Sequence, residues 1–424
     1  MPEASRFRPQ VMTSLQDIAQ QYVALVLATG QHDPDYVDAY YGPPEWKADA
    51  EAHPQTLTDL EARAEQLQQR LASLGRDAGP RGDVREAEML GWRKAYLRKQ
   101  IGALQTRLAI LRGTVLPFDE ESLALYDAVA RERTEDEFRT ALDALSRLLS
   151  GAGSVLDRYV AFRDRYVVPP ECLPQVCEAA IGACRTRTAQ ALRLPHGEQF
   201  TLEFVTGKSW SGYNWYQGHF HSVIQINTDL PVHIDRALDL AAHEGYPGHH
   251  VHNVLIEQHL VRERGWVEFT VYPLFSPQSL VAEGIPNCAV DVVFSTSERL
   301  ALERDVLFPL AGLDPATAAR HATVSALVEK LSHAGTEAAR RLLDGRLDDQ
   351  GAVEWLERYA LHSRPRAEQR VRFIRQYRSY VINYTRGREL VEAWLTRKSG
   401  EDRATRWAAL GDLMSSPRLA SSLQ

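Results

Sequence analysis

The sequence predicts a mainly α-helical protein that carries one small antiparallel β-sheet. Apolar residues recur every three or four positions through most of the 424 residues, the spacing of helices with one buried face. Alternation of apolar and polar residues, which is typical of strands, is concentrated in residues 199–227. Eight of the 14 histidines fall between His219 and His259, in and after these strands. We therefore expect helices around a short sheet, with the chemistry concentrated beside it.

Composition favours a globular protein over one that binds nucleic acid or spans a membrane. The net charge of −7 and the pI near 6.1 lack the basic field that phosphate binding needs. No run of 18 apolar residues is present, and the first residues lack the apolar core of a secretory signal. Four cysteines in this length do not make a disulfide framework. We expect a cytoplasmic protein with no nucleic-acid or membrane partner, and the oligomeric state stays open.

Residues 1–168 are predicted to form a region of helical hairpins. Its predicted helices cover residues 11–28, 56–74, 84–112, 120–131, 134–149 and 153–165. Asp119 is the expected N-cap of the fourth helix, and Thr134 with Glu137 fits a capping box at the start of the fifth. Pro and Gly punctuate residues 30–46, which predicts a structured loop.

Residues 169–424 are predicted to form the metal-binding catalytic region, in one continuous domain with the first region and enclosing a cleft. Two prolines after Val168 mark the boundary. The predicted helices cover residues 171–192, 232–262, 298–310, 315–333, 336–344, 349–362, 365–395 and 403–414. Ser276 and Pro277 open one more helix, with Ser at the cap and Pro at the first position.

Two strand-like segments precede the histidine-rich helix. Residues 200–206 alternate, and residues 213–227 predict a hairpin with its turn near Gly218. His219 and His221 would then share one strand face. The edge of such a sheet can accept an extended peptide by main-chain pairing, although a purely structural hairpin fits the pattern equally well.

The stretch from His243 to His250, His-Glu-Gly-Tyr-Pro-Gly-His-His, predicts a metal site. In the strict His-Glu-x-x-His pattern the two histidines lie four apart, on one helix face, and bind one ion. Here the fourth position is Pro247, which cannot bind a metal and disturbs the helix. A kink at the Pro-Gly step would bring His249 to the ion, whereas His250 on an ideal helix would lie about 10 Å beyond His243. His243 and His249 are the predicted ligands, with His250 as the alternative.

Glu244 is the predicted general base. A free carboxylate beside a metal ligand can take a proton from the attacking water and pass it to the leaving group. The expected cofactor is one zinc ion, because imidazole and carboxylate groups are common zinc ligands.

The His-Glu-x-x-Pro-Gly-His-His element resembles the motif of a bacterial family of unknown function that is related to gluzincin-type metallopeptidases. More distantly it is similar to His-Glu-x-Gly-His of the Taq-type carboxypeptidases and the thimet oligopeptidases. Aligning the Gly-His step makes His249 the counterpart of their second ligand, with two residues inserted before it. The resemblance implies a gluzincin-like helical fold with the small sheet beside the metal-binding helix.

The same resemblance implies a third ligand and an oxyanion donor. A gluzincin takes its third ligand from a Glu on a later helix, and Glu283 fits within Ala-Glu-Gly in an apolar stretch where an unpaired carboxylate is unfavourable. The family's late Tyr-x-x-Gly is matched by Tyr384, and Tyr380 lies one turn earlier. Arg378 and Arg386 are candidates to bind a substrate carboxylate, with surface placement as the alternative.

Together these residues predict a zinc-dependent hydrolase, most simply a metallopeptidase that cleaves short peptides. One alternative is a metal-dependent amidase with a non-peptide substrate, which would use the same residues. A second is a metal-binding protein without catalysis, in which the Pro-Gly insertion misplaces the base. A third is a structural helical protein, which would bind no stoichiometric metal. The expected partner is a small peptide or amide substrate.

Overall fold

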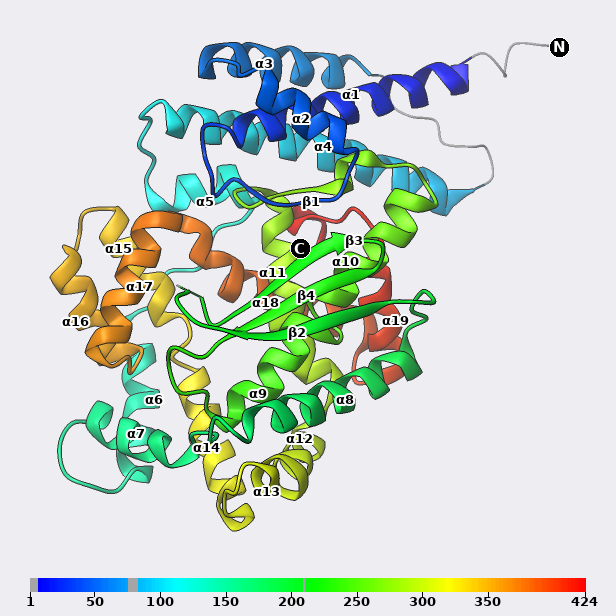
Figure 1. Cartoon of the computed structure of the whole chain (residues 1–424). Coiled ribbons are helices and arrows are strands. Elements are labelled where there is room, and N and C mark those ends of the chain that lie inside the picture. The colour runs from blue at the N-terminus through cyan, green and yellow to red at the C-terminus, as the bar shows by residue number, and fades with distance from the viewer. Residues whose placement is uncertain (1–6, 75–82, 209) are drawn as a thin grey trace.

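The protein is mainly helical in the computed structural model, which describes residues 7–74, 83–208 and 210–424 (Figure 1). The helices of the first half are α1 Phe7–Thr29, α2 Pro44–Ala52, α3 Leu57–Ser73, α4 Val84–Leu111, α5 Phe118–Tyr126, α6 Glu135–Leu148, α7 Val155–Arg163 and α8 Leu173–Ala191. Those of the second half are α9 Ile234–Leu240, α10 His249–Ile256, α11 Pro277–Val293, α12 Thr296–Leu302, α13 Phe308–Leu310, α14 Ala318–Glu329, α15 Ala334–Leu343, α16 Asp349–Tyr359, α17 Arg364–Tyr377, α18 Ile382–Ser399 and α19 Arg403–Met414. The predicted mainly helical class is confirmed.

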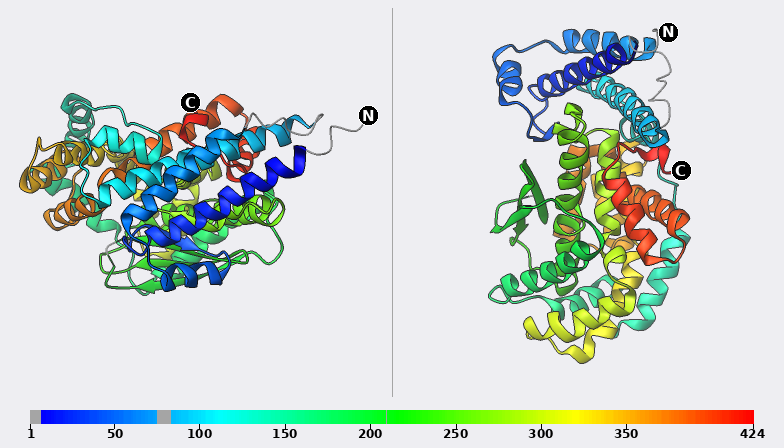
Figure 2. Two further views of the ribbon diagram at one scale, coloured as in Figure 1. Left: turned by 90° about the horizontal axis from the view of Figure 1, so that it is seen from above. Right: turned by 90° about the vertical axis from the view of Figure 1, so that its right-hand side faces the viewer.

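Helices α1, α3 and α4 form a layer at one end of the molecule (Figures 1 and 2). Helix α3 illustrates how the sequence sets such an element. Thr56 caps it, and the Asp59 N–H donates to the Thr56 hydroxyl at 3.2 Å. Its buried residues recur at three- and four-residue spacing and face the neighbouring helices: Leu60, Ala64, Leu67 and Leu71.

A two-stranded ribbon joins this layer to the rest of the chain. Strand β1, Val37–Tyr40, pairs antiparallel with β5, Val271–Pro273. A buried ion pair adds to the junction, because Arg93 Nε lies 2.6 Å from Glu268 Oε1. These contacts cross the boundary predicted after residue 168. A structured loop with short helical turns was predicted for residues 30–46, and β1 was not predicted because a four-residue strand is too short to show alternation.

The three-stranded sheet is mixed, which corrects the predicted antiparallel sheet. Strands β3 Gly212–Gly218 and β4 His221–Asn227 form the predicted hairpin, with both turn residues, His219 and Phe220, at positive φ. Strand β2, Gln199–Val205, pairs parallel with β4, so that the order is β2-β4-β3. Alternation identified each strand but carried no information on their order. His219 lies in the turn, and so it does not share a strand face with His221.

The histidine-rich helix is interrupted, whereas a continuous helix was predicted over residues 232–262. Helix α9 passes into a π-helical turn over Ala241–Gly245, and α10 begins at His249. A Cβ atom at position 248 would lie 1.8 Å from the His243 carbonyl oxygen, so only glycine fits there. The kink predicted at the Pro-Gly step is therefore present: the π-helical turn ends at Gly245, and a new helix begins at His249.

Helices α11 and α18 pack along each other in the centre of the molecule, with α10 and the sheet on one side (Figure 2). Their backbones come so close that a Cβ atom at position 284 would lie 2.6 Å from the Gly387 carbonyl oxygen. This close approach brings Glu283 near the start of α18, where Tyr384 lies.

The single helix predicted over residues 365–395 is divided into α17 and α18. Arg378 has φ of 52°, and a 3₁₀ turn covers Arg378–Val381. The buried Glu121 accepts from Arg378 Nε at 2.7 Å and from the Ser379 N–H at 3.1 Å, which holds the turn in place. The sequence between these helices is helical in composition, and so the break depends on a partner 257 residues away.

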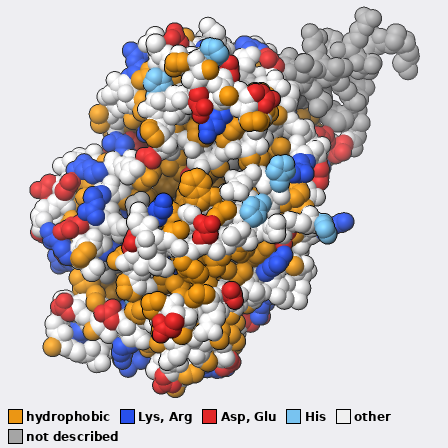
Figure 3. All heavy atoms as spheres, in the orientation of Figure 1, with side chains coloured by type: hydrophobic (Ala, Val, Ile, Leu, Met, Phe, Trp, Pro, Cys, Tyr) orange, Lys and Arg blue, Asp and Glu red, His pale blue; other side chains and the backbone are white. Residues whose placement is uncertain are grey.

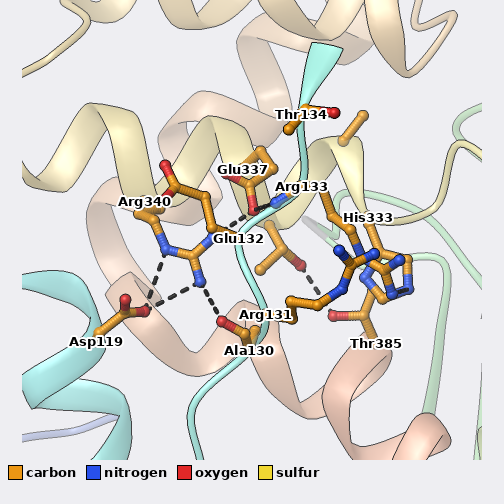
Figure 4. Close-up of polar contacts among 12 residues, drawn as sticks. Asp119, Ala130, Arg131, Glu132, Arg133, Thr134, His333, Glu337, Arg340 and Thr385 are labelled. Atoms are coloured by element: carbon orange, nitrogen blue, oxygen red, sulfur yellow. Dashed lines mark hydrogen bonds and ion pairs between the residues drawn. The ribbon is translucent and has the colours of Figure 1, made fainter. Parts of the chain in front are cut away.

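Helix α5 ends earlier than predicted, and its N-cap is also different. It begins at Phe118 after Pro117 and ends at Tyr126, rather than extending to residue 131. Asp119 caps nothing; it accepts from Arg340, which also donates to the Ala130 carbonyl at 2.6 Å (Figure 4). The predicted capping pair of α6 is confirmed, because the Thr134 N–H donates to Glu137 at 3.1 Å.

Candidate metal centre

Three elements present the predicted ligands to one another. The π-helical turn carries His243, the first turn of α10 carries His249, and α11 carries Glu283. Glu283 Oε2 lies 3.6 Å from His243 Nε2 and 3.8 Å from His249 Nε2. The two imidazole rings have centroids 4.9 Å apart and are nearly perpendicular. The structure thus brings together the three residues predicted as ligands.

Glu244 also borders this centre. His243, Glu244 and His249 each offer a ligand atom within 4.8 Å of the others. The carboxylates of Glu244 and Glu283 are therefore both near the histidine pair. The contacts of Glu283 favour it as the metal ligand. Glu283 Oε1 accepts from the Tyr380 hydroxyl at 2.8 Å, whereas Glu283 Oε2 is buried, has no hydrogen-bond donor among the described residues and faces both imidazoles.

The unpaired oxygen of Glu283 fits a cation. A buried carboxylate oxygen without a donor is unfavourable unless a positive charge compensates it. Two imidazoles and one carboxylate are a donor set of catalytic zinc sites, which leave a further position open. His243, His249 and Glu283 therefore match a zinc ion in ligand type and in mutual approach.

The electrostatics favour the metal-binding form of two of the three residues, Glu283 and His249, whereas at His243 a proton competes with a metal. Burial favours the neutral form of Glu283, but His243 and His249 outweigh it and lower the pKa of the carboxyl. Burial lowers the pKa of His249 to about 4, so this imidazole is neutral near pH 7. Burial acts in the same direction on His243, but Glu283 and Glu244 outweigh it and raise its pKa.

Glu244 lies under the start of β3. The Asn214 side-chain amide donates to the Glu244 carbonyl at 2.8 Å, and a Cβ atom at position 212 would lie 2.9 Å from Glu244 Oε1. Burial raises the pKa of Glu244 to about 7, while the neighbouring His243 lowers it. A carboxyl with a pKa near neutrality can both take and return a proton.

Tyr380 and Tyr384 lie on the α18 side of the centre with ring centroids 5.7 Å apart. Tyr380 is buried, and its hydroxyl is engaged by Glu283. Tyr384 is half-buried, and within the described chain no hydrogen bond holds its hydroxyl. Of the two tyrosines predicted as catalytic, Tyr384 is thus the one whose hydroxyl is available, while Tyr380 contacts a predicted ligand.

His250, the alternative second ligand, belongs to a different buried network. Its Nδ1 lies 2.8 Å from the Ser222 hydroxyl, and its Nε2 lies 3.0 Å from Glu198 Oε2. Tyr246 donates to the same Glu198 oxygen at 2.6 Å. Both ring nitrogens of His250 are therefore occupied by protein groups, which ties α10 to the sheet and leaves His249 beside Glu283.

Replacing His250 by Ala is expected to lower the free energy of unfolding by about 1–3 kcal/mol, because it leaves Ser222 and Glu198 without this buried partner. Urea denaturation of the zinc-free protein measures the change. His259→Ala is the matched control, since that ring is more exposed and its polar partner within the described chain is Glu263, at 2.9 Å. Unchanged stability together with loss of zinc would instead identify His250 as a ligand.

Two residues of the β1–β5 ribbon that border the site were not predicted from the sequence. Asp38 accepts from the Tyr213 hydroxyl, and burial raises its pKa to about 6, with a smaller contribution from Glu283. The hydroxyl of Tyr272 is buried and forms no hydrogen bond within the described ranges, and burial followed by Glu283 raises its pKa. Neither residue stands in a motif, and so no sequence signal could have identified them.

Comparisons with known proteins do not assign the chain to a family. No family model and no curated protein matches the sequence. Among solved structures, a "putative lipoprotein" from Colwellia psychrerythraea is similar with a TM-score of 0.49 and 13% identity, over 87% of this chain and 71% of that one. A "putative lipoprotein of unknown function" from Shewanella oneidensis gives 0.44 and 12%, over 88% and 76%. None of the helices within the described ranges is long and apolar enough to cross a membrane.

Proposed function

We propose that the protein is a zinc-dependent hydrolase of the gluzincin type that cleaves peptide bonds in short peptides. The observation that carries this proposal is the approach of His243, His249 and Glu283 to one another, with a buried Glu283 oxygen that no described residue hydrogen-bonds. Glu244 beside this group supplies a proton acceptor of suitable pKa. Without an ion, the Glu283 carboxylate has the imidazoles at 3.6 and 3.8 Å and the Tyr380 hydroxyl to compensate its charge.

Each residue then has a role that follows from its position. His243, His249 and Glu283 hold the ion, which when bound polarises water and the scissile carbonyl as a Lewis acid. Glu244 accepts the proton of the attacking water and delivers it to the leaving amine. The hydroxyl of Tyr384 donates to the oxygen that becomes negatively charged. Tyr380 orients Glu283 through its 2.8 Å hydrogen bond.

The surroundings of the site favour a short, extended substrate. The surface is hollowed between α17, the β1 ribbon and the start of β3, and hydrophobic side chains gather in the hollow (Figures 1 and 3). Strand β3 is an edge strand of its sheet, and its first residues lie beside Glu244. An extended peptide lying along such an edge gains main-chain hydrogen bonds, which a non-peptide amide would not form.

Hydrolysis of a mixed library of short peptides by zinc-loaded protein tests the proposal, with mass spectrometry as the readout. We expect cleavage that stops when zinc is chelated and returns when zinc is restored. A parallel panel of non-peptide amides tests the amidase alternative, which predicts turnover in that panel alone. Stoichiometric zinc without turnover in either panel would leave a metal-binding protein, and the proposed hydrolase would be wrong.

A further inference from the structure

Four arginines without carboxylate partners gather at one side of the proposed site. They are Arg163 at the end of α7, Arg236 in the first turn of α9, and Arg366 and Arg370 on α17. None of the four has a carboxylate within 4 Å anywhere in the described chain, and none is fully buried.

The arginines predicted as substrate-binding residues behave differently. Arg378 is held by Glu121 at 2.7 Å, and Arg386 lies 3.1 Å from Glu389. Their charges are therefore already neutralised by the protein. The cluster of Arg163, Arg236, Arg366 and Arg370 was not identified from the sequence, because its members come from three helices that are distant in the chain.

Ring contacts connect the cluster to the candidate metal centre. The Arg370 guanidinium lies 5.8 Å from the centre of the Tyr384 ring and 4.7 Å from that of Phe373. Tyr384 in turn contacts Tyr380, which donates to Glu283. Arg370 is thus separated from the predicted ligand by two side chains.

Arg236 extends the cluster toward His243 and Glu244. It precedes His243 by two helical turns, and its Nη2 lies 3.5 Å from the hydroxyl of Ser211, next to the start of β3. Its charge acts on both Glu244 and His243. The cluster therefore extends along the wall formed by α9 and α17.

The cluster is electrostatically unfavourable without an anion. Arg366 is exposed on one side, and the protein around it, followed by the charges of Arg163 and Arg236, lowers its pKa. Arg366 also lies in the first turn of α17, where the helix dipole disfavours a cation and favours an anion. Asp235 adjoins Arg236 in the chain, and the charges of His321, Arg163 and Arg236 outweigh burial and lower its pKa, but it forms no ion pair with the four arginines in the described structure. Features that oppose stability are expected mainly where function requires them.

We propose that Arg366 and Arg370, supported by Arg163 and Arg236, bind an anionic group of the substrate, so that the hydrolase acts on acidic substrates. This inference rests on the proposed function, whose substrate class it specifies. The group is a carboxylate or a phosphate, because a guanidinium binds either in bidentate fashion. Arg366 and Arg370 lie four residues apart on one helix face, so both can contact the same anion.

Isothermal titration with succinate and with inorganic phosphate tests this subsite directly. We expect the protein to bind at least one of the two probes, and the preferred probe identifies the anionic group. Arg366→Gln and Arg370→Gln should each weaken binding roughly tenfold or more. Arg372→Gln is the matched control, since Arg372 is exposed on the same helix and has no ion pair in the described structure; it should bind as the unmodified protein does.

Thermal unfolding separates a binding role from a structural one. Removing one charge from a cluster of like charges should leave the melting temperature of Arg366→Gln unchanged or higher. A lower melting temperature with unchanged anion binding would overturn the inference, as would the absence of binding by the unmodified protein.

The titrations are repeated after chelation, which keeps the two proposals distinguishable. Anion binding by a protein that takes up no zinc would refute the hydrolase and leave the subsite. Zinc uptake and peptide cleavage without anion binding would support the hydrolase and refute the anion subsite.

Discussion

His249→Ala and Glu283→Gln are each expected to lower zinc affinity more than roughly 100-fold, whereas the unmodified protein binds one ion per chain. Loss of a group that only supports a ligand already weakens metal sites by about 10–100-fold, and loss of a ligand should exceed that. Glu283→Gln keeps the size of the side chain and the acceptor for Tyr380 but removes the charge that faces both imidazoles. Competition with a chromophoric chelator measures affinity, and elemental analysis measures stoichiometry.

The adjacent histidine provides the sharpest control for this experiment. His250→Ala should keep zinc affinity within a few-fold at temperatures where it stays folded, because its ring nitrogens contact Ser222 and Glu198. His259→Ala controls for the loss of any imidazole from this part of the chain. Retention of tight zinc binding by both His249→Ala and Glu283→Gln would show that the ion binds elsewhere.

Local sequence patterns could predict the helices and the kink at the motif. Helix α19 was predicted with its observed bounds, and α3 and α4 within one or two residues, because caps and apolar spacing are local signals. The placement of His249 beside His243 also follows locally, since Pro247 and Gly248 end the first helix and start the next.

Non-local partners explain the features that the sequence could not predict. Strand β1 exists because β5 pairs with it from more than 200 residues away, and the break before α18 exists because Glu121 accepts from Ser379. The parallel pairing of β2 with β4 likewise depends on the order of the strands in the sheet, which local alternation does not determine. The arginine cluster and Asp38 are missed for the same reason, because their environment is created by the fold.

Glu244→Gln is expected to abolish most of the hydrolytic turnover while leaving zinc bound. Glutamine has nearly the same shape but cannot accept and return a proton, and general acid–base groups contribute about 10²–10⁴-fold to rate. Glu283 and the two histidines are unchanged, so zinc affinity should stay close to that of the unmodified protein. The measurement is kcat for a peptide found in the library screen, together with zinc content of the same sample.

Asp38→Asn is the comparison that makes the Glu244 result specific. Asp38 also borders the site and has a pKa raised by burial, to about 6, but it accepts from Tyr213 and is not in the group that His243, Glu244 and His249 form. A proton acceptor in the reaction must lie beside the water that attacks, a condition that Glu244 meets through its place next to His243 and His249. We therefore expect a loss of kcat of roughly 10³-fold for Glu244→Gln and less than about tenfold for Asp38→Asn. Equal losses in the two variants, or turnover by Glu244→Gln close to that of the unmodified protein, would mean that another group takes the proton.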